Sequence, residues 1–344
     1  MRSDAERLPA GKLGMDLLCE LLAGCGAGHG VVLGPGVGRD VAVVDAGGNR
    51  YWLLKSDPVT FATDEIAHYA VTVNANDIAT AGGTPRWFLA TLLLPEAGIT
   101  RGEVASLFEQ IRAACGRCGV TLVGGHTEVT AAVNRVVIAG SMVGEVAKGS
   151  LIRSCDVAIG DAILCSKGVP IEACAILARE KREELLAAGF GPEVLAGLAN
   201  LLHDPGISVL EDARTACAAA PVHAMHDPTE GGVATALWEL ALASEVGLLV
   251  DAASIPVLDA ARSLCAHFGI DPLGTIASGA LLVAVAPEDA DRVTRACAAK
   301  GIRCARIATA VDPARGVRLV SGGRELELPR FDQDEIVKAL ERDS

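Results

Sequence analysis

Short turns rich in small residues, each beside an acidic or amide side chain, are the feature of this sequence best suited to chemistry. They occur at 34–40, 55–57, 74–77, 124–128 and 226–232. Glycine lets the backbone approach a ligand closely and leaves N–H groups free to face anionic oxygens. A carboxylate repels a phosphate, but it can hold one through Mg²⁺, which takes oxygen ligands and bridges carboxylates to substrate phosphates. The pattern therefore predicts a metal–nucleotide site.

These turns need strands and helices to bring them together, and the hydrophobic periodicity supplies both. In the first half we expect strands at 41–46, 51–55, 87–94, 120–123 and 136–146, with helices at 66–81 and 100–118. In the second half we expect strands at 161–166, 248–250, 280–285 and near 307, with helices at 170–188, 209–220, 232–245 and 288–300. Strands and helices mixed throughout indicate an α/β or α+β fold.

The length of 344 residues predicts roughly two domains. We expect a leader at 1–30 with a helix at 15–23, a first domain at 31–147, a second domain at 151–330 and a tail at 331–344. The linker prediction rests on the small and polar residues Ala-Lys-Gly-Ser at 147–150, which lie between the strands expected in the two halves.

Composition excludes several classes of function. The net charge of −13 argues against nucleic-acid and anionic-membrane partners, which need a basic surface. No apolar run reaches the ~18 residues that span a bilayer, and the first residues lack a signal-peptide pattern, so we expect a cytoplasmic protein. The eleven cysteines are odd in number and irregular in spacing, which is typical of free thiols in a reducing compartment.

Taken in order, the turns resemble motifs of the aminoimidazole ribonucleotide (AIR) synthetase superfamily, which includes thiamine-monophosphate kinase, selenophosphate synthetase and the hydrogenase-maturation carbamoyl dehydratase. The resemblance rests on G-P-G-V-G-R-D-V-A-V at 34–43, K-S-D at 55–57, V-N-A-N-D-I-A at 73–79 and G-G-H-T at 124–127. The segments H-D-P-T-E-G-G at 226–232 and S-G-A-L-L-V-A-V at 278–285 look most like the hydrogenase-maturation branch. The resemblance covers about residues 30–330.

This resemblance implies a PurM-like two-domain fold: an N-terminal mixed sheet that forms a barrel across a homodimer, and a C-terminal α/β domain. It also implies ATP held at the subunit interface and Mg²⁺ on its phosphates. The implied metal ligands are Asp40, Asp57, Asp77 and Asp227. The implied cofactor-binding residues are Gly36, Gly38, Asn74, Asn76, Gly124, Gly125, Thr127 and Glu128. The implied catalytic residues are Asp57, His126 and Lys55.

The sequence departs from the family pattern at three places. Arg39 stands where relatives often have a second acid, and His126 replaces a common Asp or Glu. The hydrogenase-maturation enzyme carries its substrate group on a terminal Cys, whereas this chain continues from Leu328-Pro329-Arg330 to its last residue without one. We therefore expect a diffusible small-molecule acceptor.

Three functional hypotheses follow from the resemblance. The first is an ATP- and Mg²⁺-dependent enzyme, nearest to the hydrogenase-maturation branch, that activates an acceptor oxygen by phosphoryl transfer. The second is a small-molecule kinase like thiamine-monophosphate kinase. The third is a non-catalytic ATP-binding maturation protein, which the residues at 39 and 126 favour. The expected partners are a second copy of the chain, a small molecule and maturation proteins.

Overall fold

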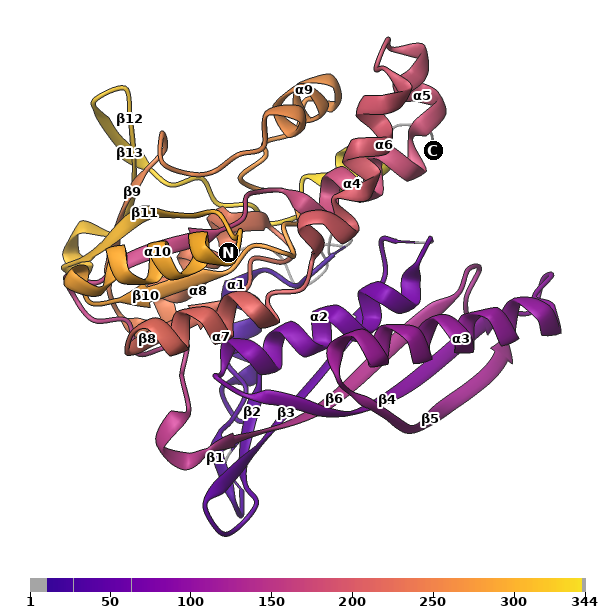
Figure 1. Cartoon of the computed structure of the whole chain (residues 1–344), viewed down its shortest axis with the longest axis horizontal. Coiled ribbons are helices and arrows are strands. Elements are labelled where there is room, and N and C mark those ends of the chain that lie inside the picture. The colour runs from indigo at the N-terminus through magenta and orange to yellow at the C-terminus, as the bar shows by residue number, and fades with distance from the viewer. Residues whose placement is uncertain (1–10, 27, 63, 342–344) are drawn as a thin grey trace.

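The computed structural model describes residues 11–26, 28–62 and 64–341. Residues 1–10 and 27 of the predicted leader and residues 342–344 of the predicted tail lie outside the described residues. The chain forms two halves that pack against each other, each built on one mixed β-sheet (Figure 1). The predicted mixed α/β class is confirmed.

The first sheet has the strand order β1-β2-β3-β6-β4-β5, and its neighbours are antiparallel except for β4 and β5. Its strands are β1 (Val31–Leu33), β2 (Ala42–Asp45), β3 (Arg50–Val59), β4 (Thr84–Pro95), β5 (Thr121–Thr130) and β6 (Val137–Ala147). β3 runs four residues beyond its prediction, because its pairing with β6 continues to Val59. Its pairing with β2 stops at Leu54, so the part of β3 that carries Lys55 and Asp57 is paired on one side.

Two helices cover one face of this sheet, and both confirm predictions. α3 (Arg101–Cys118) begins with a capping box between Thr100 and Glu103 and ends at Gly119 in the left-handed conformation. α2 (Ile66–Thr80) is buried on nearly all sides, because it lies between the sheet and the second half of the chain. A helix placed in this way must bury polar residues too, and Asn74, Asn76 and Asp77 are among them.

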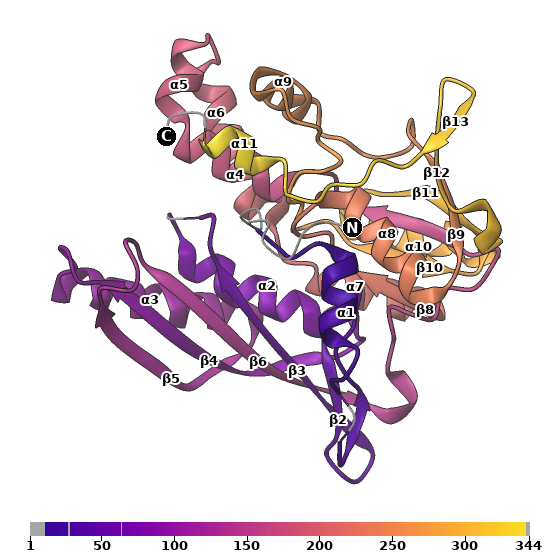
Figure 2. The same cartoon turned by 180° about the vertical axis from the view of Figure 1, so that it is seen from behind.

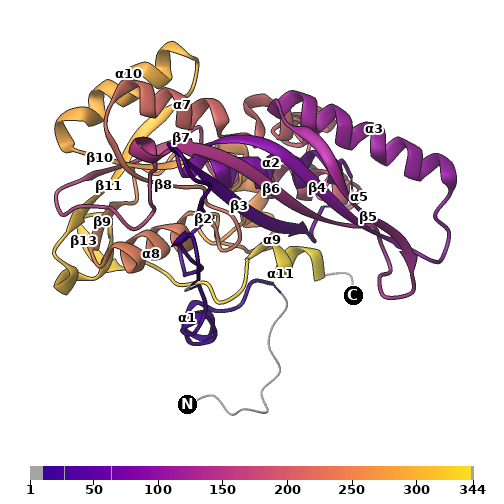
Figure 3. The same cartoon turned by 90° about the horizontal axis from the view of Figure 1, so that it is seen from below.

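None of the helices formed by the described residues covers the other face of the first sheet, as Figure 3 shows. Large apolar side chains are exposed there and on the edge strand: Trp52, Trp87, Leu89, Val123 and Val129. Several large apolar side chains exposed on one sheet are typical of an interaction face.

The second sheet has the order β13-β12-β9-β11-β7-β10-β8, with β9 and β12 as its parallel pair. Its strands are β7 (Ala162–Ser166), β8 (Val222–His226), β9 (Gly247–Asp251), β10 (Leu282–Val285), β11 (Cys304–Val311), β12 (Val317–Ser321) and β13 (Arg324–Glu327). The helices of this half are α4 (Ile171–Glu180), α5 (Arg182–Ala187), α6 (Pro192–Asn200), α7 (Leu210–Ala219), α8 (Gly232–Ser244), α9 (Asp259–Phe268) and α10 (Ala290–Ala299). Short helical turns are η1 (Lys148–Ser150), η2 (Leu202–Gly206), η3 (Pro287–Asp289) and η4 (Pro313–Arg315).

The single helix predicted at 170–188 is wrong. The backbone leaves the helical region at Lys181, so α4 and α5 are separate helices. No glycine or proline marks the break. The predictions also missed β1, β8, β12, β13, α6, α9 and α11 (Ile336–Leu340).

The two ends of the described chain both contact the second half, the first through Lys12, which bonds to Glu230 and Glu239, and the last through its terminal helix. α1 (Met15–Leu22) confirms the predicted leader helix, and α11 (Ile336–Leu340) lies beside α4 (Figure 2). Asp334 fixes the tail, because its carboxylate accepts hydrogen bonds from the main-chain N–H groups of Gly231 (2.7 Å) and Ile336 (2.8 Å). In the described part of the chain, no helix combines the length and apolar character that crossing a membrane requires.

A polar cluster joins the halves at the start of α2. Arg179 of α4 pairs with Glu65 at 2.7 Å, and His203 of η2 pairs with the same carboxylate at 2.9 Å. The ring of His68 lies 5.1 Å from that of His203 and 3.1 Å from the Arg117 guanidinium. Burial, helped by Arg117 and His203, lowers the pKa of His68 to about 4.

This pKa predicts acid sensitivity. Between about pH 6.5 and about pH 4, His68 takes up a proton more readily in the unfolded chain than in the folded one, so it makes stability fall as the pH falls. We expect the melting temperature of His68→Asn to drop less than that of the wild type from pH 7 to pH 4, as measured by circular dichroism. The exposed His126→Asn is the control. Equal drops in both variants would contradict the assignment.

Candidate active site

A cavity of about 600 Å³ lies between the two halves. Six of the predicted site residues line it: Gly36, Gly38, Asp40, Lys55, Asp57 and Asp77. They come from the loop between β1 and β2, from β3 and from α2, which are separate in sequence. The cavity is thus the place where the glycine loop, the carboxylates and the lysine meet.

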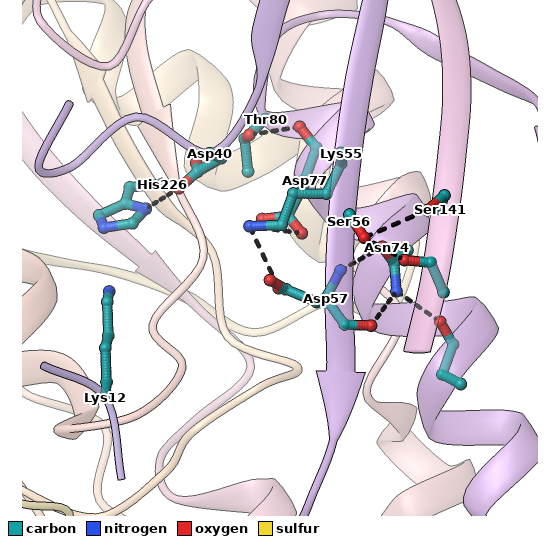
Figure 4. A network of polar contacts seen from close by, with 12 residues as sticks. Lys12, Asp40, Lys55, Ser56, Asp57, Asn74, Asp77, Thr80, Ser141 and His226 are labelled. Atoms are coloured by element: carbon teal, nitrogen blue, oxygen red, sulfur yellow. Dashed lines mark hydrogen bonds and ion pairs between the residues drawn. The ribbon is translucent and has the colours of Figure 1, made fainter. Parts of the chain in front are cut away.

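Lys55 lies between two of the predicted metal ligands (Figure 4). Its Nζ is 3.1 Å from Asp57 Oδ2 and 3.4 Å from Asp77 Oδ2. Burial by itself lowers the pKa of Lys55, but Asp77, Asp57 and Asp40 outweigh it and raise that pKa above its usual range. Burial also raises the pKa of Asp77 well above normal, although Lys55 opposes the shift. Lys55 is therefore a cation that stabilises crowded carboxylates.

Asp40 belongs to a chain of charged groups that reaches the leader. Its Oδ1 is 2.8 Å from Nδ1 of His226, whose Nε2 is 2.8 Å from Glu239 of α8. The other oxygen of Glu239 accepts from Lys12 Nζ at 2.8 Å. Burial by itself lowers the pKa of His226. Asp40 and Glu239 outweigh this effect and raise the pKa well above its normal range. Both ring nitrogens face carboxylates, an arrangement that favours the charged imidazolium form of His226.

Glu239 shows the matching shift. Burial by itself raises its pKa, but the His226 ring and Lys12 lower it to about 2. Because Glu239 is almost fully enclosed, it stays ionised only with these partners.

Asp227, directly after β8, completes the acidic group. Its side chain is 1% exposed, and neither carboxylate oxygen has a hydrogen-bond partner among the described residues. Burial, helped by Asp40, raises the pKa of Asp227 to about 7. A carboxylate that is buried without a partner costs free energy unless a cation joins it.

The donor set suits a hard divalent cation. One ligand atom each from Asp40, His226 and Asp227 lies within 4.8 Å of the others, and Asp40 Oδ2 is also without a partner among the described residues. Mg²⁺ prefers oxygen ligands, so the carboxylates of Asp40 and Asp227, with Asp57 and Asp77 nearby, fit it better than the imidazole does.

The two predicted asparagines make bonds to protein in this structure. The carboxamide of Asn74 accepts from Asp57 N at 3.0 Å and donates to Asp57 O at 3.2 Å, so it fixes the backbone that carries a predicted ligand. Asn76 donates to Ile207 O at 2.8 Å and accepts from Val209 N at 2.9 Å, which links α2 to the second half. Both therefore position the site through the backbone.

The fourth motif lies elsewhere. Gly124, Gly125, His126, Thr127 and Glu128 are exposed on the edge strand β5 and do not line the cavity of their own chain. His126 Nε2 is 3.1 Å from Glu128 Oε2.

Gly125 has a structural task that is separate from any cofactor. Its φ is +143°, and a Cβ there would lie 1.9 Å from the carbonyl oxygen of Ala90 on β4. We expect Gly125→Ala to lower the free energy of unfolding by about 3 kcal/mol, at the upper end for overpacking, in a denaturant titration. Gly116→Ala on α3, where a Cβ meets nothing within 4 Å, is the control. A Gly125→Ala protein as stable as this control would refute the structural role.

Several residues of the site escaped the sequence prediction. His226 and Glu230 stood inside a quoted motif without a role, and Glu239 follows that motif on α8. Lys12 carries no local signal, since its partner lies 227 residues away. Tyr69, Glu172 and Ser278 also line the cavity.

The AIR synthase related protein family matches residues 38–146 through its N-terminal domain and residues 159–321 through its C-terminal domain. Carbamoyl dehydratase HypE of Cupriavidus necator is 32% identical, over 80% of this chain and 78% of its own length. The chain belongs to the AIR synthase related protein family.

A second relative of this AIR synthase related chain is a hydrogenase expression/formation protein of Methanocaldococcus jannaschii, which is 32% identical over 68% of the chain. That match spans 66% of the relative's length, just under two thirds. The relatives named carbamoyl dehydratase are enzymes, so the chain belongs to a family that contains enzymes. The resemblance drawn from the motifs, including its hydrogenase-maturation branch, is confirmed.

Solved structures share the fold of the AIR synthase related chain. Escherichia coli HypE matches with a TM-score of 0.69 and 26% identity, over 83% of this chain and 87% of that one. AaThiL complexed with AMPPCP and TMP matches with a TM-score of 0.70 and 21% identity, over 96% of this chain and 99% of that one.

Two more solved complexes share the fold of this chain. HypE with ATP gives a TM-score of 0.66 and 23% identity, over 87% of this chain and 90% of that one. The HypE–HypF complex gives a TM-score of 0.69 and 23% identity, over 84% of this chain and 93% of that one. These likenesses confirm the two-domain fold of this family.

Proposed function

We propose that the chain is an ATP- and Mg²⁺-dependent enzyme that transfers a phosphoryl group from ATP to an oxygen of an acceptor and so makes that oxygen a leaving group. The observation that carries the proposal is the convergence of Asp40, Lys55, Asp57 and Asp77 on one cavity, with Asp227 beside Asp40. HypE and ThiL structures with ATP or AMPPCP support nucleotide binding in this fold. Phosphoryl transfer asks the protein mainly for positioning and charge neutralisation.

The residues divide this work. Asp40, Asp57, Asp77 and Asp227 would hold Mg²⁺, which when bound neutralises charge on phosphate oxygens. Gly36 and Gly38 keep the loop before β2 free of side chains; a Cβ on Gly38 would lie 2.8 Å from Glu239 O. Lys55, held by the carboxylates of Asp57 and Asp77, is placed to contact a phosphate.

We propose a diffusible small molecule as the acceptor. Two contacts hold residues 329–341: Arg330 stacks 3.9 Å from the centre of the Trp238 ring, and the carboxylate of Asp334 accepts from Gly231 N. The buried side chains of α11 hold this segment further. These contacts support an acceptor that is not carried on this segment.

ADP release tests the function. We expect purified chain with Mg²⁺ and ATP to release ADP when fractions of a metabolite extract are added, with a product identified by mass spectrometry. The same mixture with EDTA is the control. ADP release that never exceeds the EDTA background with any fraction would refute catalysis.

The product separates the two alternative functions. A small-molecule kinase, which the likeness to AaThiL favours, leaves a stable phosphorylated product, whereas activation of an oxygen ends in dehydration or cyclisation with free phosphate. A non-catalytic maturation protein binds ATP tightly without turnover at saturating Mg²⁺. Arg39 favours this third function, although its guanidinium donates to Gly34 O at 3.2 Å and so supports the loop.

We also propose that two copies pair through the uncovered face of the first sheet, where Trp52, Trp87 and Leu89 are exposed. Pairing would form the barrel that the family resemblance implies, and it would bring Gly124–Glu128 of one copy toward the cavity of the other. Light scattering should give a dimer for the wild type and a monomer for Trp87→Asp. Mixing Asp57→Asn and His126→Ala chains should restore activity if each site draws on both copies.

The same proposal includes three further points. They are a maturation-protein partner, a cytoplasmic location and a division into domains at 31–147 and 151–330. The solved HypE–HypF complex supports the partner, and the free cysteines among the described residues support the reducing compartment. The two family-domain matches at 38–146 and 159–321 support the division. Co-elution with a HypF-like protein of the same organism tests the partner. Cell fractionation tests the location, and limited proteolysis at 148–150 tests the domain boundary.

A further inference from the structure

A second set of polar side chains lines the cavity and has no role in the phosphate site. Tyr69 comes from α2, Glu172 from the first turn of α4, and Ser278 from the segment before β10. They are 1%, 5% and 1% exposed. The Tyr69 hydroxyl, Glu172 Oε2 and the Ser278 hydroxyl make no hydrogen bond of ordinary geometry with the described residues.

Tyr69, Glu172 and Ser278 line the same cavity, and Glu172 lies near the other two. Burial, and then the charge of Glu172, raises the pKa of Tyr69. Burial raises the pKa of Glu172 to about 7, and the carboxylates of Asp334 and Glu230 add to the rise, while the hydroxyl and main-chain N–H of Ser278 oppose it. Glu230 also feels the charge of Asp57, so this group of side chains adjoins the phosphate region of the cavity.

The set has a cost that a ligand would remove. A buried polar atom without a partner costs about 1–3 kcal/mol; the Tyr69 hydroxyl has no partner among the described residues, and Ser278 is the neighbour that hydrogen-bonds Glu172. Both hydroxyls can accept a hydrogen bond, and so can an ionised Glu172. The nearby carboxylates of Glu230 and Asp334 repel an anion and attract a cation.

We propose that Tyr69, Glu172 and Ser278 form a subsite that binds a positively charged nitrogen group, an ammonium or a guanidinium, on the acceptor. The proposal rests on the proposed function, because it assigns the acceptor to the cavity that also holds the nucleotide. Glu172 pairs with the charge, and the two hydroxyls accept the remaining N–H groups. Acceptors that present only a carboxylate or phosphate here are rejected.

Three probes that differ only in their head group test this chemistry: butylamine, butyramide and butyrate. Saturation-transfer NMR on the whole chain with Mg²⁺ and AMPPCP should detect butylammonium and give much weaker signals for the other two. We expect Glu172→Gln to weaken butylammonium binding by about tenfold or more, as for other hydrogen bonds to charged groups. Glu193→Gln, on the exposed side of α6, is the matched control.

A second pair of variants guards against a folding defect. Tyr69→Phe removes one hydroxyl and should weaken butylammonium binding several-fold, while Tyr51→Phe should not. AMPPCP affinity, measured by calorimetry, should stay unchanged in all four variants, which shows that the phosphate region is intact.

The outcomes separate the two proposals. Butylammonium binding that is equal in the wild type, Glu172→Gln and Tyr69→Phe overturns the subsite, and so do equal signals for the three probes. Bound AMPPCP without bound butylammonium overturns the subsite and leaves the proposed function standing. Glu172-dependent butylammonium binding by a chain that does not bind AMPPCP supports the subsite and refutes the proposed function.

Discussion

Replacing Asp57 by Asn is expected to weaken Mg²⁺-dependent ATP binding by about a hundredfold, or about 2.8 kcal/mol, and to abolish ADP release. The side chain keeps its size but loses the charge that a divalent cation requires. Asp57 faces the cavity beside Asp77, with Lys55 Nζ at 3.1 Å and Asn74 holding its backbone. Calorimetry with AMPPCP, with Mg²⁺ and with EDTA, measures the effect.

Asp45→Asn is the matched control for this experiment. Asp45 lies on β2 and pairs with Lys148 at 2.7 Å, away from the cavity lining. Its nucleotide affinity should equal that of the wild type. If Asp57→Asn also binds as the wild type does, Asp57 is structural and the metal site needs other ligands.

Replacing Lys55 by Met should destabilise the protein by about 3–5 kcal/mol in EDTA at pH 8, because it leaves the buried Asp77 carboxylate without its cation. The pKa of Asp77 is already raised by burial, so the loss grows as the pH rises through that pKa and fades at acid pH, where the carboxyl is protonated. Mg²⁺ should restore part of the stability, since it can take over the neutralising role. Denaturant titrations at pH 5 and pH 8, with and without Mg²⁺, measure both effects.

Lys148→Met is the control, since Lys148 pairs with the exposed Asp45 and surface pairs contribute little. A Lys55→Met protein that loses the same stability at both pH values, with no response to Mg²⁺, would show that Lys55 acts through packing alone.

Local chemistry was enough to predict part of this molecule. The capping box at Thr100 and Glu103 and the apolar spacing of α2 and α3 are visible in short windows, because helix ends and faces follow contacts three or four residues apart. The grouping of Asp40, Asp57 and Asp77 came from the order of the motifs, and the structure brings all three to one cavity.

The break between α4 and α5 at Lys181 shows where local signals end. Neither glycine nor proline is present there, and packing of the second half decides the bend. The extension of β3 to Val59 has a similar origin, since its length is set by β6, a strand about 80 residues later in the chain.

The family, the mixed α/β class and the acidic and glycine residues that could bind a nucleotide are recognisable from residue types in short motifs. Long-range contacts are not: Lys12 meets Glu239, 227 residues away, and Asn76 donates to Ile207 O, 131 residues away. The same holds for the position of His126 outside its own chain's cavity and of Tyr69, Glu172 and Ser278 on its lining. The packing of two sheets and their helices sets which distant side chains meet, and no local spacing encodes that geometry.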